Sequence, residues 1–215
     1  MRNRIVATPF ALILVFTMPI KSASYAVPTN NIIEEKYNTT SRSISQALGR
    51  TAIYAMEELS GLIGTCVGSW SGIFITAVMG YVLLPRLGFD IEPESETYRT
   101  YSAFFIYYPM TATGAATGTT CTGKILRQKG SFTGALIGSA LVITAVAFPE
   151  YLAHKYHLND DIFESPWLEL LFFPSIGTGA VIGYNYELFK SDKKELLYCL
   201  IGCTLSSIAY IFARL

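Results

Sequence analysis

The chain has 215 residues, of which 51% are hydrophobic and only 15% are charged. Soluble domains usually carry about 25% charged residues, so this composition indicates a membrane protein. The 16 basic and 16 acidic residues balance each other. This balance excludes the strongly basic character that nucleic-acid binding favours and leaves the lipid bilayer as the expected partner.

The first 26 residues have the three parts of a secretory signal peptide. Arg2 and Arg4 precede an apolar run over 5–20, and the segment 24–26 (SYA) supplies small residues for cleavage. The run is short for a membrane span, which needs about 20 apolar residues. We expect a signal peptide over 1–26 and export to the membranes of a bacterial cell envelope, inner or outer. An uncleaved N-terminal anchor is the alternative.

A polar exported arm is expected over 27–40, followed by an amphipathic helix over 41–58. Apolar residues such as Ile44, Leu48 and Leu59 recur at helical spacing, whereas Arg50 and Glu57 fall elsewhere on the helical wheel. The apolar face is made mostly of small residues, which favours packing against other helices or a membrane surface over strong independent lipid binding.

The rest of the chain, 59–215, is expected to be a membrane helical domain. Its apolar stretches approach the length of a spanning helix and are separated by charged connectors. These stretches are 59–84, 101–123, 131–149, 167–186 and 195–213. The predicted fold class is therefore all-α, a polytopic membrane helix bundle of four or five apolar helices. A β-barrel is the rival architecture, but its strands alternate strictly, and these stretches do not.

Glycine recurs every four residues in four of these stretches, which places the glycines of each stretch on one helix face. The residues concerned are Gly64, Gly68 and Gly72, Gly114 and Gly118, Gly134 and Gly138, and Gly179 and Gly183. Helices in lipid associate by close backbone approach at small residues, so this GxxxG spacing predicts helix-packing surfaces. We expect them to act within one chain and between copies, as in a homo-oligomer.

Threonines make the second stretch polar for a membrane segment. The run TATGAATGTTCTG begins at Thr111 and contains Thr117, and its hydroxyls suit either a tightly packed inner helix or the lining of a water-filled path. Pro109 and Pro174 are expected to kink their segments. Within the stretches as bounded above, no ionisable residue lies centrally, which disfavours a proton-coupled transporter.

The connectors predict which loops share a side of the membrane. The segments KILRQK (124–129) and KSDKK (190–194) are separated by two spans, so they should lie together, opposite the acidic connectors 86–100 and 150–166. With an exported N-terminus and five spans, however, most basic residues would lie outside, against the positive-inside rule. A re-entrant hairpin over 59–84, or a membrane where that rule does not act, would resolve the conflict.

The remaining candidates for chemistry are weak. Cys199 and Cys203 share one helix face inside an apolar stretch, where free cysteine packs as a small hydrophobe. His154 and His157 in the HKYHLNDD connector have the spacing of a metal site, but such pairs are common by chance on surface loops. We therefore expect no enzyme, no catalytic residues, no cofactor and no metal.

The stretch from YPMTATGAATGTTCTG to FFPSIGTGAVIGYNYE, within 101–187, resembles small signal-bearing bacterial envelope proteins rich in glycine zippers. These relatives are uncharacterised, so the resemblance implies no activity and no site. The expected function is a structural or interaction role in the envelope through glycine-zipper packing. A passive channel or small-solute permease lined by the Thr-rich segment 111–122 is the alternative.

Overall fold

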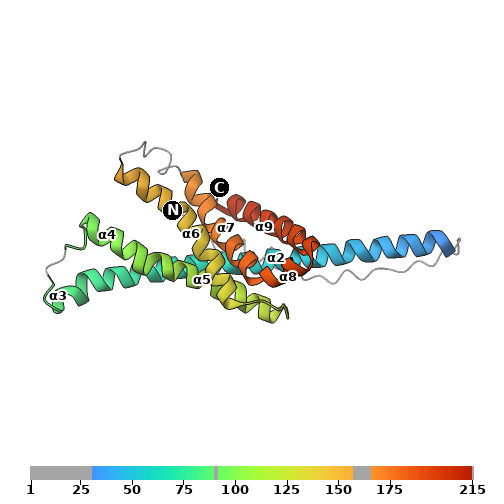
Figure 1. Ribbon diagram of the computed structural model, residues 1–215, viewed down its shortest axis with the longest axis horizontal. Helices are drawn as coiled ribbons and strands as arrows, with labels where there is room; N and C mark the ends of the chain where they lie inside the picture. The colour runs from blue at the N-terminus through green and yellow to red at the C-terminus, as the bar shows by residue number, and fades with distance from the viewer. Residues whose placement is uncertain (1–30, 90–91, 157–165, 215) are drawn as a thin grey trace, which may run out of the picture.

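The computed structural model describes residues 31–89, 92–156 and 166–214 (Figure 1). The expected signal peptide over 1–26 and the first part of the polar arm lie outside these residues. Every element within the described ranges is helical. This confirms an all-α protein.

Helix α2, Asn31–Val78, is 48 residues long and joins three segments that the sequence separates. It contains residues 31–40 of the expected arm, the amphipathic helix and most of the first apolar stretch. The chain continues through a π-helical turn, η1 (Met79–Leu83), into α3 (Leu84–Arg86). No proline interrupts α2, and Gly61 alone is too weak a helix breaker to end it. The re-entrant hairpin proposed for 59–84 is therefore wrong.

The second stretch returns along α2 as three consecutive helical pieces. These are α4 (Glu96–Ser102), the π-helical η2 (Ala103–Tyr107) and α5 (Tyr108–Ile125). Ser95 caps α4 by accepting a hydrogen bond from the Tyr98 amide. Both π-helical turns precede a proline, Pro85 or Pro109. A proline ring clashes with the carbonyl four residues earlier, and the wider π turn relieves this clash.

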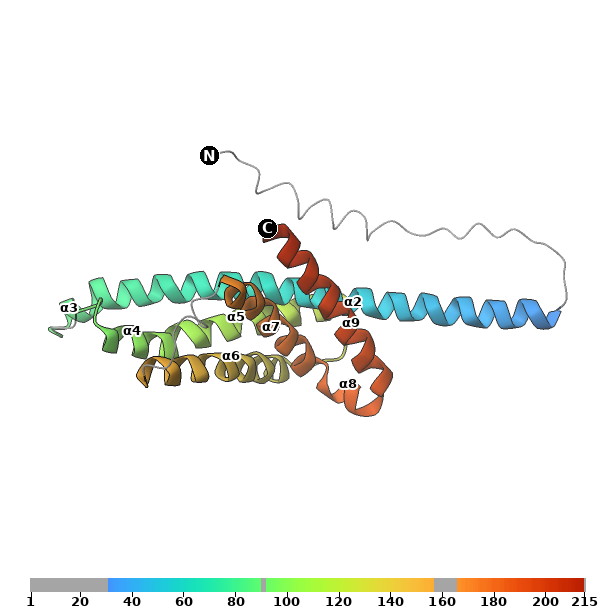
Figure 2. The ribbon, with the colours of Figure 1, turned by 90° about the horizontal axis from the view of Figure 1, so that it is seen from above.

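The C-terminal half forms two further helix pairs. Helix α6 (Phe132–Lys155) packs against α7 (Pro166–Tyr184), and each contains an internal proline. A break at Asn185 separates α7 from the short α8 (Tyr186–Ser191), and α9 (Lys193–Arg214) then crosses α2 at an angle (Figure 2). The first turns of α2 project beyond all the other helices in both views.

Among the described helices, three are long and apolar enough to cross a membrane: Ser43–Arg86, Phe132–Pro149 and Lys193–Ala213. The apolar helix Leu170–Tyr184 is shorter. The sequence predicts four or five spanning helices. Helix α5 is not among the three, because its threonines and glycines make it less apolar than a spanning helix. Helix α2 is about 72 Å long, so it extends well beyond a hydrocarbon core of about 30 Å.

The outer surface of these helices is strongly apolar. Trp70 is 73% exposed, Phe74 69% and Phe212 74%. Ile63, Val67, Trp70 and Phe74 follow helical spacing and form one continuous face of α2. Monomeric soluble proteins rarely expose apolar patches of this extent. A helix facing lipid has this pattern, so the surface agrees with a membrane location.

Helix ends that adjoin the connectors approach one another at both ends of the bundle. The Ser131 amide donates to the Tyr184 carbonyl, and the Tyr184 hydroxyl donates to the Gln128 carbonyl at 3.3 Å, so the two lysine-rich connectors lie at one end. At the other end the rings of Phe104 and Tyr151 contact edge to face, with centroids 5.8 Å apart. Helix α2 begins at the lysine-rich end (Figure 1).

Candidate functional site

A row of polar residues on one face of α2 forms the most unusual feature of the bundle. Arg50, Tyr54, Glu57 and Glu58 occupy positions i, i+4, i+7 and i+8, which share one face of a helix. That face is turned inward, and Tyr54, Glu57 and Glu58 are each 0% exposed. Fully buried glutamates are rare unless they are paired or hydrogen-bonded. The surroundings of these carboxylates therefore define the candidate site.

Glu58 is enclosed by hydroxyl groups from two other helices. On α7, Thr178 Oγ1 donates to Glu58 Oε1 at 3.0 Å. On α9, Ser207 Oγ donates to the same oxygen at 2.9 Å, and Ser206 Oγ donates to Oε2. Ser206 lies about 20 Å along α9 from Lys193, at 1.5 Å per residue. Glu58 thus contacts the interior of a candidate span and is fully satisfied as a hydrogen-bond acceptor.

Glu57 has fewer partners. Asn185, at the break between α7 and α8, donates from Nδ2 to Glu57 Oε2 at 2.7 Å and to the Val181 carbonyl at 3.1 Å. The second carboxylate oxygen, Oε1, is buried and has no hydrogen-bond partner. The side-chain oxygen of Asn185, Oδ1, is likewise buried and without a partner. Buried polar atoms nearly always have a hydrogen-bond partner, so two buried oxygens without one, in side chains that contact each other, are unusual.

A second polar cluster links this site to the lysine-rich end. The Tyr54 hydroxyl donates to Glu195 Oε2 at 2.7 Å, and Arg50 Nε lies 3.3 Å from Glu195 Oε1. Arg50 also donates to the Gln128 side chain at 3.2 Å. The side chain of Arg50 is 41% exposed and that of Glu195 11%. Polar groups therefore lead from solvent through Glu195 and Tyr54 to the turn of α2 that carries Glu57 and Glu58.

Polar groups continue along the same face of α2 toward the opposite end. Thr65 Oγ1 donates to the Gly61 carbonyl at 2.7 Å, and Ser69 Oγ lies 3.1 Å from Thr111 Oγ1. Thr119 on α5 faces Gly61, and its hydroxyl is buried without a partner. From Arg50 to Ser69 this row of polar groups extends about 28 Å along the helix axis, close to the thickness of a hydrocarbon core.

The structure brings the glycines named above together in two helix pairs. A Cβ atom at Gly64 would collide with the Gly114 carbonyl, one at Gly68 with the Met110 carbonyl, and one at Gly72 would lie 2.9 Å from Tyr107 Cα. Gly118 faces the Ser60 carbonyl in the same α2–α5 pair. In the α6–α7 pair, Gly134 faces Gly183 and Gly138 faces Gly179. At each of these positions the neighbouring backbone leaves no room for a side chain.

The threonines of α5 divide between two faces. Thr111, Thr119 and Thr120 are buried, whereas Thr113 and Thr117 are exposed and bond back to carbonyls of their own helix at 2.7 Å. The hydroxyls of segment 111–122 therefore do not all face the interior of the described bundle, and a path lined by the whole segment stays a prediction.

The cysteine and histidine candidates contribute little. Cys199 and Cys203 are buried with their sulfurs 3.8 Å apart, and they pack in an apolar cluster with Tyr54, Val181 and Phe189. The side chain of His154 and all of His157 lie outside the described part. Within the described part, no three His, Cys, Asp or Glu side chains gather as metal ligands.

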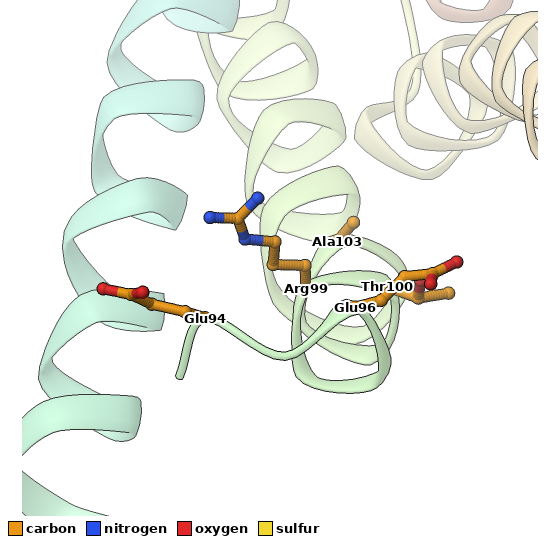
Figure 3. Close-up of a pocket in the computed structure, with 5 residues that line it drawn as sticks. All are labelled: Glu94, Glu96, Arg99, Thr100 and Ala103. Carbon is orange, nitrogen blue, oxygen red and sulfur yellow. The ribbon is translucent and has the colours of Figure 1, made fainter. Parts of the chain in front are cut away.

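Two hollows lie at the opposite end from the lysine-rich connectors. The first, of about 500 Å³, is open and lined by Glu94, Glu96, Arg99, Thr100 and Ala103. Figure 3 shows Glu94 and Arg99 directed to one side of α4 and Glu96 to the other.

The second hollow, of about 320 Å³, lies between α2 and α4 and is lined by Thr76, Tyr81, Tyr98 and Tyr107 among others. The Tyr98 hydroxyl donates to the Thr76 carbonyl at 2.6 Å, and burial raises the pKa of this phenol above its ordinary value. Tyr98 is thus a neutral donor that ties α4 to α2.

Sequence reasoning missed the carboxylate site. It placed Glu57 on the polar side of a surface helix and ended that helix at residue 58, so both glutamates fell outside the apolar stretches. The structure differs in that α2 continues from 41–58 into the first apolar stretch, and both glutamates are buried on a helix long and apolar enough to span. The available signal was the lack of any helix breaker between 41–58 and 59–84.

Comparison with known proteins adds no relative: the chain matches no protein-family model, no curated protein and no solved structure.

Proposed function

We propose that this protein is an integral membrane protein that transfers a small cation, the proton included, across the bilayer. The observation that carries this proposal is the complete burial of Glu57 and Glu58 on a helix long and apolar enough to span. A charged carboxylate in a membrane is costly, and such residues mark ion pathways and proton relays. The proposal places the protein in a cell envelope, with lipid as its partner.

The arrangement of the polar groups supports transfer along α2. Tyr54 and Glu195 connect the carboxylates to the solvent-exposed Arg50. Thr65, Ser69 and Thr111 extend the row in the other direction. A chain of hydroxyl and carboxylate groups can pass protons or hold small cations without a wide pore. Larger solutes would need more space than these closely packed helices leave.

A structural or interaction role is the second candidate, and the glycine contacts favour it. In this second proposal the protein acts as a structural element of the membrane, and GxxxG-type packing of α2 on α5 and of α6 on α7 holds its helices together. Both faces are covered by helices of the same chain, so association between copies stays a prediction that needs another surface. Two buried glutamates are, however, costly to place in a purely structural bundle, since replacing buried charges by apolar side chains is often neutral or stabilising.

Ion flux in reconstituted liposomes distinguishes the two candidates. Vesicles would carry a pH-sensitive dye or a sodium-sensitive dye, and a potassium gradient with valinomycin would supply the driving potential. We expect wild-type protein to give flux above empty vesicles and the variant carrying Glu57→Gln and Glu58→Gln to lose it by about tenfold or more. Glu187→Gln, which alters an exposed glutamate on α8, is the matched control and should transport normally.

Equal flux in the wild type and the double glutamine variant would refute the transfer proposal. Flux indistinguishable from that of empty vesicles, with both dyes and either sign of the potential, would also refute it and would favour the structural role. Folding of each variant would be checked by circular dichroism before flux is compared.

A further inference from the structure

We infer that Glu57 is held as a carboxylic acid whose proton is shared with the side-chain carbonyl of Asn185, which makes the proton the ion bound at this site. The inference deepens the proposed function and rests on it, because it names which cation the buried glutamates carry. It depends on hydrogen-bond accounting at Glu57, on the contrast with Glu58 and on the charges nearby.

Hydrogen-bond accounting leaves one donor missing between Glu57 and Asn185. The two side chains share the bond from Asn185 Nδ2 to Glu57 Oε2, 2.7 Å long. The remaining oxygen of each side chain is buried and accepts nothing. A proton on Glu57 Oε1, directed at Asn185 Oδ1, supplies the missing donor to both oxygens at once. A carboxylic acid and a primary amide each offer one donor beside one acceptor, so they can pair through two hydrogen bonds.

Glu58 provides the contrast within the same turn of helix. Its carboxylate accepts from Thr178, Ser206 and Ser207. Three donated hydrogen bonds stabilise the charged form of a carboxylate. Glu57 receives a single donated bond and is equally buried. The neighbouring glutamates therefore differ in state, with Glu58 the anion and Glu57 the acid.

The charges around the pair argue in the same direction. Titratable groups packed around this turn of α2 are Tyr54 and Glu58 on α2 itself, Tyr184 on α7, and Cys199, Cys203 and Glu195 on α9, which contacts the turn through Tyr54 and Glu58. Arg50 is the nearby cation, and it pairs with Glu195. With Glu58 already anionic and Arg50 engaged, a second bare carboxylate at Glu57 would be repelled and unmatched.

A metal ion fits this site less well than a proton. Hard cations such as Ca²⁺ and Mg²⁺ take about six or more oxygen ligands. The pair offers two unengaged oxygens, and the hydroxyls around Glu58 already direct their protons at its carboxylate. One proton satisfies both free oxygens without rearrangement.

Infrared spectroscopy of the full-length protein in lipid tests the inference without measuring transport. The C=O stretch of a protonated carboxylic acid is separate from the carboxylate bands and shifts in D₂O. We expect this band at neutral pH in the wild type and in Glu187→Gln, and its loss in Glu57→Gln. Absence of the band in the wild type, or its persistence in Glu57→Gln, would overturn the inference.

The variant Asn185→Val identifies the partner of the proton. Without the amide acceptor, the acid band should move toward the frequency of an unbonded carboxylic acid; an unmoved band would show that Asn185 is not the partner. If this variant does not fold, the comparison of wild type with Glu57→Gln still decides whether Glu57 is protonated. Flux without the band would leave cation transfer standing and refute the proton site. The band without flux would leave the protonated Glu57 standing and refute cation transfer.

Discussion

Helix α2 packs by two different chemistries along its length. From Gly64 to Gly72 it lies against α5 with backbone touching backbone, and side chains are excluded from the contact. From Arg50 to Glu58 it lies against α7 and α9 through long polar side chains. The glycine region gains stability from close approach, as expected in lipid. The glutamate region keeps groups that are expensive to bury, and the proposed ion transfer gives these groups a role.

The largest effect should come from filling the glycine contact. In Gly68→Leu the new side chain would meet the Met110 carbonyl, so α5 would have to move away from α2. We expect more than about 3 kcal/mol of destabilisation and loss of the monodisperse protein in detergent. Thermal unfolding followed by circular dichroism, with size-exclusion chromatography, measures this.

Gly49→Leu is the matched control for that substitution. Gly49 lies on the same helix, with open space around its Cα, and leucine is the better helix former by about 1 kcal/mol. This variant should be as stable as the wild type or slightly more so. Equal behaviour of Gly68→Leu and Gly49→Leu would contradict the packing role of the glycine face. Gly138→Leu makes the same test in the α6–α7 pair.

Truncating Glu58 should have the next largest effect. Glu58→Ala removes the acceptor of three hydroxyl donors, of which Ser206 is buried and Thr178 and Ser207 are half-buried, and we expect a loss of about 2 to 4 kcal/mol in the free energy of unfolding. Glu58→Gln keeps the volume and one carbonyl oxygen, so it should lose less. Glu187→Ala, at an exposed position, should change little. If Glu58→Ala, Glu58→Gln and Glu187→Ala all unfolded alike, the hydrogen bonds from the three hydroxyl groups to Glu58 would not contribute to stability.

Removing the Tyr54 hydroxyl should have a smaller effect. In Tyr54→Phe the ring still fills its buried position, while Glu195 loses a hydrogen bond of 2.7 Å but keeps its contact with Arg50. We expect about 1 kcal/mol of destabilisation, together with slower proton transfer in liposomes if this hydroxyl connects Glu195 to the glutamates. Unaltered flux would remove Tyr54 from the proposed route.

The sequence predicts the helices well, because hydropathy is a local pattern, whereas the role of the glycine faces in packing stays a prediction that the substitutions above test. Which connectors share a side of the membrane stays a prediction from the span lengths. The sequence does not predict the burial of Glu57 and Glu58. Their partners Thr178, Asn185 and Ser206 lie more than a hundred residues away, and no local pattern shows that α7 and α9 would enclose the first helix.

The continuous α2 also sharpens the question of orientation. Without a re-entrant hairpin, the start of α2 and the lysine-rich connectors lie at the same end (Figure 1). An exported start of α2 would then place these lysines outside, against the positive-inside rule. In a cytoplasmic membrane that rule predicts the lysine-rich end inside. The expected signal peptide over 1–26 and this orientation therefore conflict, and a membrane in which the positive-inside rule does not act removes the conflict.

The smallest effect is expected at Thr117, on the outer face of α5. Its hydroxyl is exposed and bonds to the Thr113 carbonyl of the same helix, so Thr117→Leu should change stability by less than about 0.5 kcal/mol and leave flux unchanged. Thr111→Val is the informative companion, because Thr111 is buried and pairs with Ser69 across the α2–α5 contact at 3.1 Å. Thr111→Val should lower the free energy of unfolding by about 1 kcal/mol. It should also reduce ion transfer if protons or cations follow the polar face of α2. Loss of flux in Thr117→Leu with normal flux in Thr111→Val would reverse this assignment and place the route on the outer face of α5, between copies of the chain.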